Sequence, residues 1–409
     1  MSKLLAVMTP WVGLSLMTED DFRVAASPLF AGGEVDVLEW SFDAGRRPVP
    51  AWAEALLDHY AGEGRLFGHG VHYSPFSARW EPRQQSWLEA LGRELSRRRY
   101  ARVSEHYGFM TAAPYVRGAP LPVPRDRASL QVGRERLDRM RAVLSTGGTC
   151  PLGLENLALA WSRDEALAHG AFLDDVLTHD DDFIVLDVHN LYCQTENFGL
   201  SPDELLATFP AARVGELHVS GGSVLPAWPG GRDEVRCDTH DHAVPACVFD
   251  LLERALARFP NVRAVVFERL GGTIRTVEDA EALRSDFRRT RELAARARGV
   301  ADAGAAPSLP DARRASAPER GGVVALAALP SGAASSARGD DDALAEFQSA
   351  LLALFERESD EFVIRAHLEV APEFAPYRAA VRAFDGRALG VAARVVKKWT
   401  RRAPATHDP

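Results

Sequence analysis

The segment FIVLDVHNLYCQTENFG, residues 183–199, is the part of the chain that says most about fold and function. Residues 183–188 are apolar except for Asp187, a composition typical of a strand buried on both faces of a parallel sheet. The strand ends in Asp187, His189 and Asn190, and all three side chains can bind a metal ion. A strand of this kind raises the question of what the ends of the neighbouring strands carry.

The alternation of short apolar segments with helical periodicity extends from the start of the chain to about residue 296. Trp87, Leu88, Leu91 and Leu95, for example, share one face of a predicted helix. The candidate strands are residues 4–7 or 12–16, 35–42, 65–72, 101–107, 152–157, 183–188, 214–219 and 262–268. Eight such units predict an α/β fold, a closed (β/α)8 TIM barrel. An open doubly wound sheet is the rival, but no GxGxxG motif follows the first strand.

The composition changes after the predicted barrel domain, residues 1–296. Residues 297–340 are rich in Ala, Gly, Pro and Ser, which predicts a flexible linker. Helical periodicity returns in residues 341–409 and predicts a small helical C-terminal module. The basic run from Arg394 to Arg402 is either a partner-docking element or a solvated helix end, where positive charge favours the helix dipole.

Composition narrows the class of protein. The net charge of −9 and the pI near 5.8 argue against general nucleic-acid binding. Pro10 interrupts the apolar N-terminal run, so this run is interpreted as a first core strand and not as a signal peptide. The four cysteines show no CxxC spacing, which argues against a structural zinc site or a disulfide framework. A cytoplasmic location is therefore expected.

Side chains that can bind metals follow most of the predicted strands. They are His69 and His72, Glu105 and His106, Glu155 and Asn156, Asp187, His189 and Asn190, Glu216 and His218, Asp238, His240 and His242 in the loop after the seventh strand, and Glu268. The carboxyl ends of barrel strands face the active-site mouth, so these groups should converge there. Period-two geometry further predicts that Asp187 shares a face with His189, Glu216 with His218, and Asp238 with His240.

Taken singly, each of these residues is more typical of a solvated rim or of a structural hydrogen bond, and Glu105 and Glu216 are open to that interpretation. The series is not. Imidazoles and carboxylates without thiolates suit zinc, iron or manganese, and their number exceeds one coordination sphere. A site of two or three ions with bridging carboxylates is therefore predicted.

In this order, the motifs GHGVHYS, VSEHYGF, GLENLAL, LDVHN, GELHVSGG, CDTHDHAV and FERL resemble those of the multinuclear non-heme iron-dependent oxidative enzymes (MNIO), a family that includes methanobactin-biosynthesis enzymes. The resemblance extends from about residue 10 to residue 295. It implies a xylose-isomerase-like barrel, with catalytic roles for His106, Glu155, Asp187 and His218. The metal ligands that it implies are His69, His106, Glu155, Asp187, Asn190, His218, Asp238, His240 and Glu268, with His189 as a possible extra ligand.

The function that the resemblance implies is RiPP biosynthesis, the modification of a ribosomally made precursor peptide, commonly at Cys. The cofactor would be two or three iron ions, mixed Fe2+ and Fe3+, with O2 as co-substrate, and a partner protein would deliver the peptide. Departures from the family pattern at Glu39, Asp43, Gly222, Ser223 and Arg269 imply different substrate contacts. A metal-dependent sugar isomerase or epimerase, a metal-dependent hydrolase, and a non-enzymatic metal-binding module are the alternatives.

Overall fold

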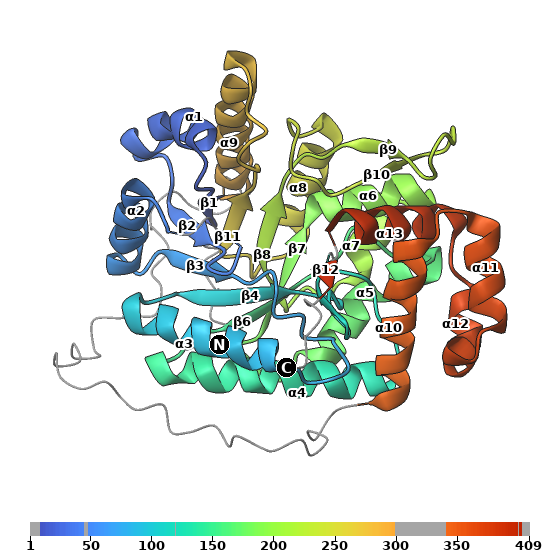
Figure 1. The fold of residues 1–409 in the computed structure, drawn as a ribbon. Helices are drawn as coiled ribbons and strands as arrows, with labels where there is room; N and C mark the ends of the chain where they lie inside the picture. Colours follow the sequence, from blue (N-terminus) through green and yellow to red (C-terminus); the bar gives the residue numbers. More distant parts are fainter. Residues whose placement is uncertain (1–8, 45–47, 119, 299–340, 400, 403–409) are drawn as a thin grey trace, which may run out of the picture.

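The computed structural model describes residues 9–44, 48–118, 120–298, 341–399 and 401–402 (Figure 1). Its centre is a closed barrel of eight parallel strands, which confirms the predicted TIM barrel. Around the barrel the strands follow in the order β1 (Trp11–Ser15), β2 (Val37–Trp40), β3 (Leu66–His69), β4 (Arg102–His106), β6 (Leu152–Glu155), β7 (Phe183–Asp187), β8 (Val214–Val219) and β11 (Ala264–Phe267), and β11 closes on β1. Of the two segments predicted as the first strand, residues 12–16 overlap β1, and residues 4–7 lie outside the described residues.

Helices cover the outside of the barrel (Figure 1). They are α1 (Asp20–Ala31), α2 (Ala51–Gly62), α3 (Pro82–Arg97), α4 (Arg127–Leu144), α5 (Arg163–Val176), α6 (Val188–Phe198), α7 (Pro202–Thr208), α8 (Ala246–Arg258) and α9 (Val277–Arg298), with a short 3-10 turn at Ser145–Gly147. Side-chain caps start several of them: Asp126 accepts a hydrogen bond from the amide of Ser129, and Ser162 accepts one from the amide of Glu165.

Two loops at the carboxyl ends of the strands carry short strands of their own. In the loop after β8, β9 (Val224–Pro226) and β10 (Glu234–Arg236) form an antiparallel pair. In the loop after β4, β5 (Tyr115–Arg117) pairs with β12 (Arg401–Arg402) from the far end of the chain. The C-terminal segment therefore reaches back to the barrel.

The interior of the barrel changes from apolar to polar along the strands. Val37, Phe67, Ala264 and Val266 form a small apolar cluster separate from the main core. Successive side chains of a strand alternate between its two faces, so the residue two positions after each member of this cluster lies on the same face of its strand. Three of those positions hold polar residues, namely Glu39, His69 and Glu268. The apolar cluster thus supports a polar layer at the carboxyl ends.

The C-terminal module consists of α10 (Asp342–Arg357), α11 (Glu361–Val370), the 3-10 helix η3 (Pro372–Tyr377), α12 (Arg378–Arg382) and α13 (Gly386–Trp399). Of the predicted linker, residues 297 and 298 belong to α9, and residues 299–340 lie outside the described residues. Phe384 stacks on Trp161 of the loop after β6, with ring centroids 4.4 Å apart and planes 16° apart. The Gln348 side chain donates to the carbonyl of Phe76 at 2.7 Å and accepts from the amide of Ala78 at 2.8 Å. The module therefore packs on the loops at the carboxyl ends of the strands.

Candidate metal centre

Three predicted residues meet where β3, β4 and β6 end. His69 Nε2 lies 3.1 Å from Glu155 Oε2, and His106 Nε2 lies 3.3 Å from the same oxygen. The Nδ1 atoms are engaged elsewhere: that of His69 is 2.8 Å from Ser104 Oγ, and that of His106 is 3.1 Å from the carbonyl oxygen of Gly70. Since a carbonyl only accepts, His106 donates from Nδ1. Its Nε2 is then free to bind a cation beside Glu155.

His218, near the end of β8, extends this group towards β11. Its Nδ1 lies 3.3 Å from Glu268 Oε2 and 3.8 Å from Glu155 Oε1. Glu155, Asp187, His218 and Glu268 are all buried, and each offers one ligand atom within 4.8 Å of the others. His69, Glu155 and His218 form a second such group. Residues from four different strands thus converge as their positions in the sequence predicted.

Asp187, Asp238 and His240 form a further group that could hold a metal ion. His240 Nε2 is 2.7 Å from Asp238 Oδ1, and His240 Nδ1 is 3.6 Å from Glu268 Oε2. The backbone of His240 has a φ of 52°, in the left-handed region that non-glycine residues rarely adopt. This conformation occurs in the loop that brings Asp238 and His240 over the strand ends, a setting in which local strain is often functional.

His189 and Asn190 are placed differently from what period-two geometry predicted. The strand ends at Asp187, and both residues lie in the first turn of α6, so a shared strand face for Asp187 and His189 is wrong. His189 nevertheless reaches the site, because its Nδ1 lies 3.2 Å from Asp238 Oδ1. The Asn190 side chain donates to the carbonyl of Asn156 at 2.9 Å. Asn156 itself binds the backbone of Asp187 and so fixes the end of β7.

Burial and like charge dominate the electrostatics of the centre. Burial raises the pKa of Asp187 well above its usual range, and the carboxylates of Asp238, Glu155 and Glu268 raise it further. Burial also raises the pKa of Glu268, but His218 and His240 more than offset this and lower it to about 2. So many acidic groups in a buried space are stable only when positive charge compensates them. A bound cation would supply that charge.

Several other predicted candidates have structural roles. Glu105 accepts hydrogen bonds from the amides of Tyr73 and Ser74, at 2.7 and 3.2 Å, and so anchors the loop after β3. His242 lies on the rim, where its Nδ1 is 2.8 Å from Asp241. Two buried carboxylates outside the ligand set that the resemblance implied do approach the centre: Glu39 and Glu216 form a group with His218. For Glu216, its position two residues before His218 was a signal in the sequence.

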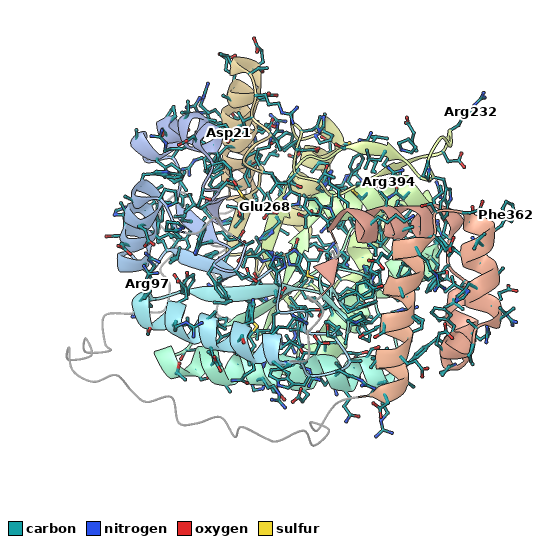
Figure 2. The ribbon with its side chains drawn as sticks, in the orientation of Figure 1. Asp21, Arg97, Arg232, Glu268, Phe362 and Arg394 are labelled. Carbon is teal, nitrogen blue, oxygen red and sulfur yellow. The ribbon has the colours of Figure 1, made fainter. Side chains whose placement is uncertain are left out.

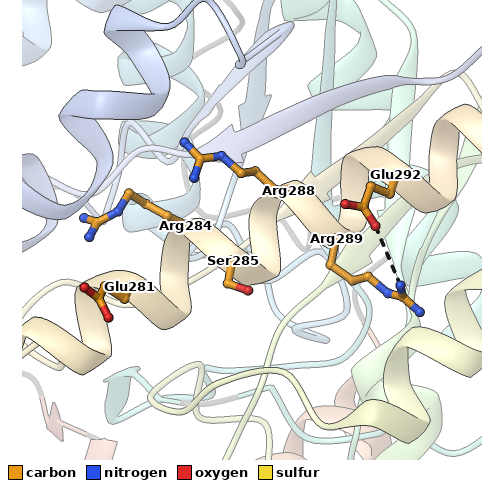
Figure 3. A pocket seen from close by; sticks show the side chains of 6 residues that line it. All are labelled: Glu281, Arg284, Ser285, Arg288, Arg289 and Glu292. Carbon is orange, nitrogen blue, oxygen red and sulfur yellow. Dashed lines mark ion pairs between the residues drawn. The ribbon is translucent and has the colours of Figure 1, made fainter.

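The surface hollow of about 600 Å³ on α9 shares no lining residue with this centre (Figure 3). It is lined by Glu281, Arg284, Ser285, Arg288, Arg289 and Glu292, all on one helix. Glu268, by contrast, lies beside the barrel strands in the middle of the molecule, while Arg97 and Phe362 are at its periphery (Figure 2). The buried groups at the strand ends therefore remain the candidate site.

The fold and the site together define the class of this protein. It is a TIM barrel with a candidate centre for several metal ions, formed by histidines and carboxylates at the ends of the strands. Residues 47–293, more than half of the chain, match the family of RiPP precursor modification enzymes MbnB/TglH/ChrH. The chain belongs to this family of enzymes, and the family implies a precursor peptide as substrate. The resemblance inferred from the strand-end motifs is thereby confirmed.

Similar proteins occur in several bacteria. A UPF0276 protein of Acaryochloris marina is 26% identical over 234 residues, which cover 54% of this chain and 80% of that protein. One of Anaeromyxobacter sp. is 28% identical, over 57% of this chain and 76% of that protein. One of Streptomyces avermitilis is 34% identical, over 42% of this chain and 33% of the longer relative.

Among solved structures, an L-ribulose 3-epimerase is similar with a TM-score of 0.46 and 15% identity, over 73% of this chain and all of that one. Endonuclease IV from Thermus thermophilus has a TM-score of 0.43 and 16% identity, over 69% of this chain and 99% of that one. Separately, none of the helices in the described ranges is both long enough and apolar enough to cross a bilayer.

Proposed function

We propose that this chain is a multinuclear iron-dependent oxidoreductase that uses O2 to modify a side chain, specifically that of Cys, in a RiPP precursor peptide. The observation that supports this most strongly is that the candidate metal groups share members. Glu155 and His218 belong both to the group with His69 and to the group with Asp187 and Glu268. Asp187 belongs to this second group and also to the group with Asp238 and His240. Shared carboxylates are what a site of neighbouring, bridged ions requires.

The residues present fit iron in their chemistry. All are nitrogen or oxygen donors, a set that suits iron, manganese or zinc better than soft metals. Several buried ligand atoms make no hydrogen bond among the described residues: Glu155 Oε2, Asp187 Oδ2, His218 Nδ1 and Glu268 Oε2. Three of them lie at ion-pair distance from one another or from His69, whereas no ion pair of Asp187 Oδ2 occurs in the described part of the chain. Buried polar atoms normally find partners, so their concentration on the predicted ligands supports a bound cation.

The ligands would divide according to the contacts already described. His69, His106, Glu155 and His218 would form one side of the centre, and Asp187, Asp238 and His240 the other. Glu268 would lie between them, because its Oε2 is within 3.6 Å of both His218 Nδ1 and His240 Nδ1. Asn190 and His189 would complete the side near Asp187. Bound iron supplies the redox chemistry through which O2 acts as the oxidant.

The differing exposure of these residues suggests where the peptide approaches. The side chains of His106, His240 and Asp238 are 22%, 19% and 26% exposed, whereas those of His69, Glu155 and His218 are at most 5% exposed. The substrate side chain would therefore enter past His106 and His240 and meet a buried interior that excludes bulk water. Glu155, Asp187 and His218 would hold the ions, and His106 would act at the entrance. A separate protein would present the precursor.

Mass spectrometry of a precursor peptide tests this proposal. The iron-loaded enzyme would be incubated in air with a short Cys-bearing peptide encoded beside its gene. The expected result is a mass change on a Cys-containing fragment that requires O2 and is lost in Asp187→Ala. A full mass change without O2, or in protein loaded only with zinc, would reject an iron-dependent oxidation and favour a hydrolase. An isomerase or epimerase would leave the mass of the peptide unchanged.

A further inference from the structure

The two ring nitrogens of His218 face different surroundings. Nδ1 faces Glu268 and Glu155, which belong to the candidate metal groups. Nε2 faces away from these residues, towards Glu216 Oε1 at 3.3 Å and Glu39 Oε2 at 3.2 Å. All of these side chains are buried. His218 is therefore the link between the candidate metal centre and a second acidic layer below it.

Glu216 is held in place by a buried arginine. Arg102 Nη1 lies 3.0 Å from Glu216 Oε2 and also donates to the carbonyl of Gly215 at 3.1 Å. The guanidinium packs over the rings of Phe67 and Phe183, 5.0 and 4.6 Å from their centroids. Since one carboxylate oxygen of Glu216 binds Arg102, the other is left to accept from His218 Nε2.

Glu39 contributes charge more than hydrogen bonding. Its side chain is fully buried, and neither of its oxygens has a hydrogen-bond partner within the described part of the chain. Oε2 nevertheless lies at ion-pair distance from His218 Nε2. A carboxylate in this position strengthens the preference of Nε2 for a proton, because an N–H next to two anions is more favourable than a lone pair.

We propose that Arg102, Glu216 and Glu39 are positioning residues that fix His218 as its Nε2–H tautomer. In this tautomer Nδ1 presents its lone pair to the metal ion, and the inference therefore rests on the iron centre proposed above. A carboxylate behind a histidine ligand sets the orientation of the ring and raises its basicity. The buried negative charge also stabilises the more highly charged, oxidised form of the metal. A third metal site at Glu39 and Glu216 is disfavoured, because the Arg102 guanidinium already compensates Glu216 and repels a cation.

The test compares Glu216→Gln and Glu39→Gln with the wild-type protein. Both substitutions keep the shape of the side chain and remove its charge. Glu165→Gln is the matched control, because Glu165 is a buried glutamate on α5 that binds the amide of Trp161 and does not contact His218. Binding of Mn2+, followed by competition with a chelator, measures affinity without any oxidation. The midpoint potential of the iron-loaded protein is the second measurement, since a purely structural role would not shift it in a defined direction.

We expect Glu216→Gln to weaken Mn2+ binding by roughly 10–100-fold, as for other carboxylates behind histidine ligands, and both site variants to shift the potential to more positive values. Glu165→Gln should change neither. Wild-type affinity and potential in both site variants would overturn the inference while leaving the metal centre intact. No binding of Mn2+ or iron by the wild-type protein would overturn the proposed function itself. If Glu216→Gln does not fold, Glu39→Gln still decides, because that side chain has no hydrogen bond to lose among the described residues.

Discussion

Asp187 accepts a hydrogen bond through Oδ1 from the backbone amide of Asn190, at 2.6 Å, and thereby caps the N-terminus of α6. Its Oδ2 has no hydrogen-bond partner among the described residues. The carboxylate also belongs to two of the groups that could hold a metal ion. A turn residue and a metal ligand are therefore compatible roles for this side chain, one for each oxygen.

The substitution Asp187→Asn separates these two roles. Asn caps helices about as well as Asp, so the variant should fold normally. The substitution removes a negatively charged metal ligand. We therefore expect the affinity for iron to fall by at least the roughly 10–100-fold that follows from loss of a residue that only orients a ligand. Iron content after purification, with folding checked by circular dichroism, measures both effects.

Asp181→Asn provides the control for this substitution. Asp181 precedes the same strand at its other end and is exposed to solvent, so its replacement should leave the iron content unchanged. Wild-type iron occupancy in folded Asp187→Asn would leave Asp187 with the capping role alone.

Phe384→Ala tests how strongly the C-terminal module is bound to the barrel. Phe384 is buried and stacked on Trp161, and removal of such a ring costs about 3–5 kcal/mol in free energy of unfolding. Phe362→Ala is the control, because Phe362 is in the same module but 84% exposed, and its loss should cost no more than about 0.5 kcal/mol. Urea unfolding compares them. Equal stabilities of the two variants would show that the stacking contributes nothing.

Glu165 predicts a specific pH dependence of stability. Burial raises its pKa to about 8, against an ordinary value of 4.5, although the amide of Trp161 favours the ionised form. Between these two values the folded state binds more protons than the unfolded state, so stability falls as pH rises, by at most about 1.4 kcal/mol per pH unit for this group. Glu165→Gln removes this contribution.

Urea unfolding of the wild-type protein and Glu165→Gln at pH 5, 6.5 and 8 measures the difference. The stability of the variant relative to the wild type should increase steadily with pH across this range. A constant difference from pH 5 to pH 8 would mean that Glu165 has the same pKa in the folded and unfolded states.

Much of the barrel and of its centre was predictable from local pattern. Each β/α unit repeats a buried strand followed by a helix, and the ends of the strands meet by the geometry of the closed barrel. The convergence of His69, Glu155, His218 and Glu268 therefore followed from their positions at strand ends. The place of His189 did not, because the turn from β7 to α6 begins at Asp187, and one residue decides between period-two and helical geometry.

Contacts between distant segments were beyond the reach of the sequence. Helical periodicity predicted the apolar faces of the C-terminal module, but nothing in it indicated that Phe384 would stack on Trp161 or that Gln348 would bind the loop at Phe76. The pairing of Arg102 with Glu216 likewise depends on the register of strands that lie far apart in the chain. Such contacts depend on how the elements are assembled, and local propensity does not record that.

Elemental analysis of the purified wild-type protein, before and after anaerobic loading with ferrous iron, tests the central claim most directly. The excess of histidine and carboxylate ligands over one coordination sphere predicts about two to three irons per chain, with visible absorption once ferric iron is present. Stoichiometric zinc with no iron, even after anaerobic iron loading, would contradict it.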